Sequence, residues 1–171
     1  ISGVDTRALT AYIRDNGMPN GVIAHNPEGR FDIDALTETA RGWNGLVGAD
    51  LAKGVHTEET FDWQQARWVW PDGYSDVDGL KKVVVIDYGV KRNILRNLTS
   101  QGLKVTVVPA TASAEDILAL NPDGVVLSNG PGDPAATGKY AVPVIRELID
   151  NKTPILETRQ LVKLVGGTEA G

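Results

Sequence analysis

The sequence has no cysteine among its 171 residues. Within these residues there is therefore no disulfide bond, no thiolate metal site and no cysteine nucleophile. Histidine is also scarce, and the two histidines, His25 and His56, lie in polar surroundings without partners at metal-ligand spacing. We therefore expect both to be exposed side chains, and we expect no metal site.

Long hydrophobic runs are absent as well. No apolar stretch approaches the roughly 20 residues of a membrane-spanning helix, and the first residues do not have the pattern of a signal peptide. An excess of positive charge is also missing, since 22 acidic residues outnumber 17 basic ones and give a net charge of −5. Because nucleic acids and anionic membranes attract basic surfaces, we expect neither as a partner. We expect a cytoplasmic protein.

The first part of the chain, residues 1–56, contains the pattern of two helices and a short strand. Asp5 is placed to cap a helix with an apolar stripe, and Gly17 follows where that helix should end. The apolar run at 21–24 predicts a strand, and residues 33–41 predict a second helix. Nothing in this part indicates catalytic chemistry.

Residues 57–82 have a different character. Trp63, Trp68 and Trp70 are followed by a turn-rich stretch of proline, glycine and acidic residues without clear periodicity. This composition predicts a linker between two domains. We expect the tryptophans to pack against a neighbouring surface.

From residue 83 onward, strand and helix patterns alternate. Continuous apolar runs, which are typical of strands covered on both faces, occur at 83–86, 105–108, 124–127 and 154–156. Helical spacing of apolar residues follows each run, the last at 161–165. This alternation predicts an α/β fold: a parallel sheet with helices on both faces.

The loop that follows the third of these runs is rich in glycine and proline. Residues 127–134 read Leu-Ser-Asn-Gly-Pro-Gly-Asp-Pro, a composition that turns sharply and leaves backbone N–H groups uncovered. Ligands bind at the carboxyl ends of strands in open parallel sheets. Three interpretations of the loop are open: a tight turn without a ligand, a loop that binds nucleotide phosphates, or a loop that binds a substrate and stabilises an oxyanion. The second interpretation lacks the Gly-Lys-Ser/Thr ending and the G-x-G-x-x-G pattern.

Four stretches of the sequence carry a resemblance to one family. Residues 127–134 resemble the glycine loop of the class I glutamine amidotransferases, and residues 87–96 are similar to the segment that opens the amidotransferase domain in small subunits of carbamoyl-phosphate synthase. Residues 2–10 and 51–53 resemble the N-terminal domain of those subunits. The resemblance implies a class I amidotransferase fold with flavodoxin-like layering at 83–171, here truncated. It is preceded by a linker at 57–82 and, at 1–56, by the C-terminal part of a smaller α/β domain.

The resemblance also implies a function. In that family a cysteine thiolate attacks the amide of L-glutamine, and a histidine held by a glutamate moves the protons. The ammonia passes to a large subunit, which makes carbamoyl phosphate for arginine and pyrimidine synthesis. ATP and magnesium are expected on that partner, and no cofactor in this chain. By position, Gly130 and Gly132 match residues that contact glutamine and form the oxyanion site, and Gln160 matches a glutamine-binding residue.

The sequence departs from the family at the nucleophile. Between Leu156 and Gln160 the chain has three residues where the family has six, and the cysteine is not among them. We therefore expect no catalytic residue and no glutaminase activity in the chain as written. Two hypotheses remain: a partial record of a glutamine-hydrolysing subunit, which we favour, or a catalytically dead amidotransferase-like module that binds a partner. A flavodoxin-like regulatory or nucleotide-binding domain is a third alternative.

Overall fold

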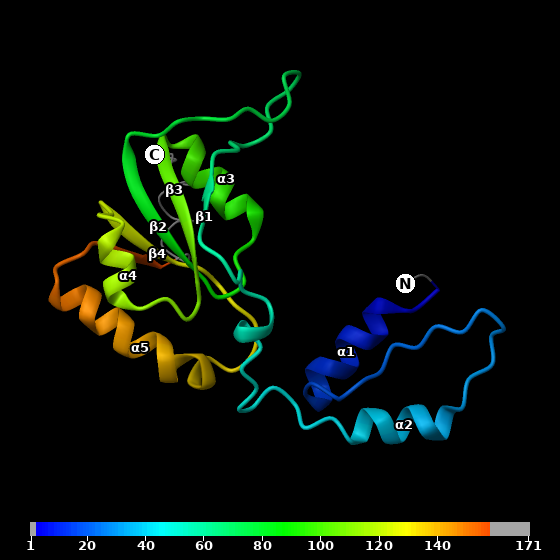
Figure 1. Cartoon of the computed structure of the whole chain (residues 1–171). Helices are drawn as coiled ribbons and strands as arrows, with labels where there is room; N and C mark the ends of the chain where they lie inside the picture. The colour runs from blue at the N-terminus through cyan, green and yellow to red at the C-terminus, as the bar shows by residue number, and fades with distance from the viewer. Residues whose placement is uncertain (1–2, 158–171) are drawn as a thin grey trace, which may run out of the picture. The chain divides into compact units, whose positions relative to one another are not determined.

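The computed structural model describes residues 3–157. The chain divides into two compact units, the first ending at Val47 and the second beginning at Gly48. Figure 1 shows the two helices of the first unit and the layered sheet of the second.

The first unit contains helix α1 (Thr6–Asn16) and helix α2 (Ile33–Arg41). The Asp5 carboxylate accepts hydrogen bonds from the first turn of α1, and Gly17 ends this helix at a φ of +81°. A carboxylate at this position satisfies N–H groups that have no partner within the helix. Both predicted helices and the predicted cap are confirmed.

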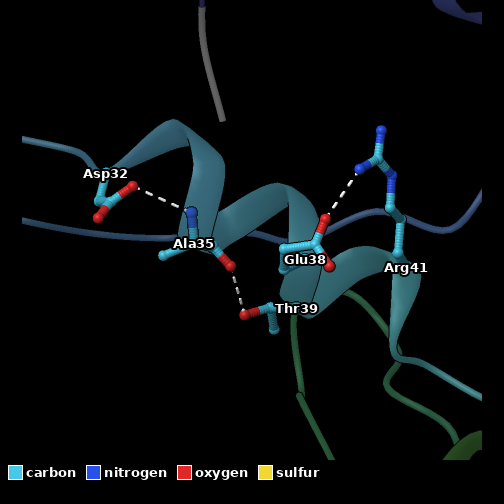
Figure 2. Close-up of polar contacts among 5 residues, drawn as sticks. All are labelled: Asp32, Ala35, Glu38, Thr39 and Arg41. Carbon is cyan, nitrogen blue, oxygen red and sulfur yellow. Dashed lines mark hydrogen bonds and ion pairs between the residues drawn. The ribbon is translucent and has the colours of Figure 1, made fainter.

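Helix α2 is stabilised by local polar contacts, which Figure 2 shows. The Asp32 carboxylate accepts a hydrogen bond of 3.0 Å from the Ala35 N–H, and the Arg41 guanidinium lies 2.8 Å from the Glu38 carboxylate. The cap at Asp32 holds only this one amide. In the second unit, the aspartate that caps α5 accepts hydrogen bonds from two backbone N–H groups.

The strand predicted at 21–24 is wrong for this structure. No strand forms there, and the side chains of Val22 and Ile23 are 41% and 82% exposed. A strand needs a neighbouring strand to satisfy its backbone groups, and the described residues of the first unit offer none. No residue among 3–47 is buried, so this unit has no core of its own within the described part.

The second unit is built on a five-stranded sheet with the order β1-β3-β2-β4-β5. The strands are β1 (Phe61–Trp63), β2 (Lys81–Asp87), β3 (Leu103–Pro109), β4 (Gly124–Leu127) and β5 (Ile155–Glu157). Strands β2 to β5 pair in parallel, and β1 pairs with β3 in the antiparallel sense. The predicted parallel sheet is confirmed, with an antiparallel edge strand in addition.

Helices cover both faces of this sheet (Figure 1). They are α3 (Arg92–Ser100), α4 (Ala114–Ala119) and α5 (Pro134–Asp150). Because successive strand residues point to opposite faces, Val83 and Val85 pack with α3, whereas Val84 and Ile86 pack with α4 and α5. This two-sided burial explains why β2 is a continuous apolar run.

Part of the predicted linker belongs to the sheet. Strand β1 pairs with β3, and the half-buried Trp63 packs on the α3 side of the sheet. The following residues fold back on themselves through isolated bridges, with Trp68 and Trp70 exposed and their ring centroids 5.9 Å apart. A three-residue strand is too short to give a periodic signal, which is why the sequence pattern did not reveal it. The domain boundaries at 56 and 82 stay a prediction.

Candidate functional site

The glycine loop, residues 127–134, begins at the carboxyl end of β4 and lies against the turn that leaves β2. A Cβ atom on Gly130 would lie 2.3 Å from the carbonyl oxygen of Tyr88, and one on Gly89 would lie 3.0 Å from Cδ of Pro131. Only glycine permits so close an approach of two backbones. The two central strands thus bring two turns together at one edge of the sheet, where ligands bind in folds of this kind.

Two buried polar side chains fix these turns from below. The Ser128 hydroxyl accepts a hydrogen bond of 2.9 Å from the Tyr88 N–H and donates one of 2.9 Å to the Asn129 carbonyl. The Asp87 carboxylate, in a residue that is 6% exposed, accepts hydrogen bonds from the N–H groups of Gly89, Val90 and Thr57 at 2.9, 2.6 and 2.8 Å. A buried carboxylate needs such donors, and these hold the turn after β2 in one conformation.

The tip of the loop is open to solvent. Gly130 and Pro131 are exposed, and Gly132 is half-buried. Within residues 3–157, no hydrogen bond is donated by the backbone N–H of Gly130 or Gly132. Uncovered N–H groups on a fixed backbone can bind a carboxylate or stabilise the negative oxygen that forms when an amide is attacked. The geometry is therefore compatible with an oxyanion and substrate loop.

Asp133 closes the glycine loop at its other end. Its carboxylate accepts hydrogen bonds from the N–H of Gly48 at 2.7 Å and from the N–H of Ala135 at 2.8 Å. These two donors, Gly48 first, lower the pKa of Asp133 below its ordinary value. The carboxylate is therefore ionised at neutral pH. It caps α5 and at the same time holds the chain that precedes the sheet.

Tyr88, next to the loop, is a buried phenol. It is 7% exposed and its ring centroid lies 6.5 Å from that of Tyr140. Burial, with a further contribution from Tyr140, raises the pKa of Tyr88 to about 12.

We expect the neutral form of Tyr88 to stabilise the fold. This contribution is fully present below pH ~10, the pKa of an ordinary phenol, and is lost as the pH rises through about 12. The measurement is an alkaline titration followed by tyrosinate absorbance, in which the difference between the protein and its Tyr88→Phe variant isolates this phenol. A difference curve with its midpoint near 10 would contradict the prediction.

The structure brings together some of the residues singled out in the sequence. Gly130 and Gly132 lie in the loop after β4, and their role in binding glutamine stays a prediction, whereas Gln160 and the segment after Glu157 lie outside the described residues. His25 is exposed as expected. His56 is not, since it is half-buried with its ring Nδ1 against the Thr57 carbonyl.

Sequence reasoning missed two parts of the site: Asp87 and residues 48–57. Residues 48–57 contact the site through residues distant in the chain, and Asp87 joins a local turn to the distant Thr57, so local periodicity has no signal for either role. The position of Asp87 directly after a buried strand was the available signal, because the carboxyl ends of parallel strands meet at one edge.

A metal site, a membrane-spanning helix and a second pocket are the other features of the described residues that could indicate a function. Among residues 3–157, no group of three or more acidic or histidine side chains could hold a metal ion, and no helix is long and apolar enough to cross a membrane. A hollow of about 390 Å³ lies beside β1 and is lined by both apolar and polar residues, among them Phe61, Asp62 and Lys82. It is remote from the carboxyl ends of the strands, where ligands bind in folds of this kind.

Comparison with known proteins agrees with the geometry. Residues 84–156 match the family Glutamine amidotransferase class-I. The chain is 62% identical over 156 residues to the carbamoyl phosphate synthase small chain of Caulobacter vibrioides, covering 91% of this chain and 40% of that protein. It is 60% identical over 157 residues to the small chain of Zymomonas mobilis, covering 91% and 42%.

A third relative aligns over nearly the whole chain. The carbamoyl phosphate synthase small chain of Mesorhizobium japonicum is 53% identical over 175 aligned residues, which cover 99% of this chain and 44% of that protein. The chain thus spans about two fifths of the length of the curated relatives it matches. The resemblance seen in the sequence is confirmed: residues 84–156 match the class-I glutamine amidotransferase family, and the chain is similar over most of its length to carbamoyl phosphate synthase small chains.

Proposed function

We propose that this chain is the glutamine-binding part of a small subunit that supplies ammonia to carbamoyl phosphate synthesis. The observation that carries the proposal is the open glycine loop, in which two glycine N–H groups without protein acceptors among residues 3–157 stand at the carboxyl edge of a parallel sheet. The family match over 84–156 and the printed names of the relatives support it.

In this proposal, Gly130 and Gly132 receive the side-chain amide of L-glutamine. When the amide carbon is attacked, its oxygen becomes negative, and donors already in place stabilise that charge without reorganising. Gln160 is proposed as a further glutamine contact. Water is the second substrate, and glutamate and ammonia are the products. A large subunit is the proposed partner, and ATP and magnesium would bind there.

These 171 residues contain no cysteine, and the position at which the family carries its nucleophile lies within them, between Leu156 and Gln160. We therefore expect the 171-residue chain alone to release no ammonia from glutamine. A full-length gene product that carries the family's complete nucleophile elbow between the positions of Leu156 and Gln160, assembled with its large subunit, is expected to release ammonia. The measurement is coupled detection of ammonia in both preparations, with a glutamine-free blank. Turnover by the 171-residue chain, or none by the assembled protein, would contradict the proposal.

A second candidate is a catalytically dead module that binds the large subunit. The missing cysteine is the observation that favours it. Both candidates predict copurification with a large subunit, so copurification alone does not separate them. Ammonia release by the assembled full-length protein does, because the dead module would form the complex and leave glutamine intact.

A further inference from the structure

The segment that precedes the sheet, residues 48–57, runs along the glycine loop. We call this segment the strap. Ala49 accepts a hydrogen bond of 2.9 Å from the Asp133 N–H through its carbonyl oxygen, and Gly48 donates one of 2.7 Å to the Asp133 carboxylate. Asp133 thus makes two opposed hydrogen bonds with successive residues of the strap, one as donor and one as acceptor.

The loop has no room to move toward the strap at Gly132. A Cβ atom at this position would lie 2.5 Å from the carbonyl oxygen of Ala49 and 2.9 Å from the nitrogen of Leu51. Gly132 also has a φ of +88°, in the region that side chains rarely adopt. Glycine at position 132 therefore permits both the positive φ of the loop and its close contact with the strap.

The middle of the strap is anchored in the core. Ala52, in a 3₁₀ turn at Ala52–Gly54, is 0% exposed and packs with the cluster between the sheet and α5. The Tyr140 hydroxyl on α5 donates a hydrogen bond of 3.1 Å to the Asp50 carboxylate. The Lys53 ammonium lies 3.7 Å from that carboxylate and 4.7 Å from the centroid of the Tyr140 ring. These contacts keep the strap from sliding along the loop.

The far end of the strap reaches the turn after β2. The Thr57 N–H donates to the buried Asp87 carboxylate at 2.8 Å. A Cβ atom on Gly89 would lie 3.2 Å from Cγ2 of Val55. The strap therefore touches both turns that form the edge of the site, one at each of its ends.

We propose that the strap fixes the conformation of the glycine loop, and that Asp133 is the positioning residue that joins them. The strap lies outside residues 84–156, which match the amidotransferase family. In this chain the shape of the loop is therefore set in part by a segment that the family domain does not include. The consequence for glutamine rests on the proposed function: without the strap, the N–H groups of Gly130 and Gly132 lose their fixed direction.

The substitution Asp133→Asn tests the proposal without removing the cap of α5. Asparagine caps helices as well as aspartate, but the N–H groups of Gly48 and Ala135 bind different oxygens of the Asp133 carboxylate, and asparagine replaces one of these oxygens by an NH2 group that cannot accept. The matched control is Asp32→Asn in α2, where the carboxylate holds one amide only (Figure 2). Asp133→Ala, which loses both hydrogen bonds, gives the upper limit of the effect.

The first readout is hydrogen exchange of the 171-residue chain, which needs no glutamine. In Asp133→Asn we expect peptides from 48–57 and 127–134 to exchange about tenfold faster, the factor expected for one lost hydrogen bond. The Asp32→Asn control should leave both peptides unchanged. Unchanged exchange in Asp133→Asn would overturn the proposal.

The second readout is glutamine hydrolysis by the full-length protein assembled with its large subunit. Because oxyanion donors act in the transition state, kcat should fall by about 10²-fold in Asp133→Asn with a smaller change in KM. Faster exchange with an unchanged kcat would overturn the positioning role of Asp133. If the unsubstituted protein released no ammonia, the proposed function would fail, while the exchange measurement would still decide whether the strap holds the loop.

Discussion

Replacing Gly130 by alanine will force the glycine loop out of its observed position. The new methyl group would lie 2.3 Å from the carbonyl oxygen and 3.0 Å from Cβ of Tyr88. Tyr88 is 7% exposed and its backbone N–H donates a hydrogen bond to the Ser128 hydroxyl, so its backbone cannot move away from the new methyl group. We expect a loss of about 1–3 kcal/mol in the free energy of unfolding, as for overpacked interior positions.

The same substitution should remove most glutamine turnover. If the loop N–H groups stabilise the oxyanion, their displacement should lower kcat of the assembled full-length protein by about 10²–10³-fold, the effect of losing one such donor. Urea unfolding of the 171-residue chain measures the first effect, and ammonia release by the assembled protein measures the second.

Gly138 provides a matched control for this experiment. It lies within α5, and a Cβ atom there would be 3.7 Å from Val142, an ordinary contact. Gly138→Ala should therefore raise the free energy of unfolding by about 0.5–1 kcal/mol, because alanine favours the helix. Turnover should not change. Equal effects of the two substitutions would show that Gly130 has no special role.

Local patterns in the sequence predicted most of the second unit. The four parallel strands follow from apolar runs, since a strand buried on both faces has no polar side. The cap of α4 could also be predicted: Ser113 accepts a hydrogen bond from the Asp116 N–H, and the Asp116 carboxylate accepts one from the Ser113 N–H. Such features depend on residues within one turn of each other, and tertiary packing leaves them unchanged.

The features that sequence reasoning did not reveal are long-range. Strand β1 forms only because β3 offers it an edge, and the strap is held by residues 30 to 90 positions later in the chain. Neither has a periodic signal of its own. The wrong strand at 21–24 is the opposite case, in which a local apolar run has no partner among residues 3–47.

The candidate site also has a part that the local sequence predicted and a part that depends on long-range contacts. The composition of the loop at 127–134 indicated uncovered N–H groups, and the open tip agrees with that expectation. What holds the loop in place could not be predicted, because Gly132 packs on Ala49 and Gly130 packs on Tyr88. A glycine reveals that a close approach is possible, but not which backbone approaches.

Replacing Leu148 by alanine will destabilise the second unit without changing the site. Leu148 is 0% exposed and packs between α5 and the sheet. Truncating a fully buried leucine leaves a cavity and costs about 2–5 kcal/mol, a large share of the 5–15 kcal/mol that stabilises a typical domain. The midpoint of urea unfolding should fall accordingly, at an unchanged slope.

The adjacent residue is the control, since one position along a helix turns a side chain by about 100°. Ile149 is 57% exposed, so Ile149→Ala should change the free energy of unfolding by no more than about 0.5 kcal/mol. A comparable loss in both variants would mean that α5 is rotated relative to the sheet. The glycine loop is positioned by the strap and Tyr88 rather than by Leu148, so Leu148→Ala should lower stability and leave the KM for glutamine of the assembled protein unchanged.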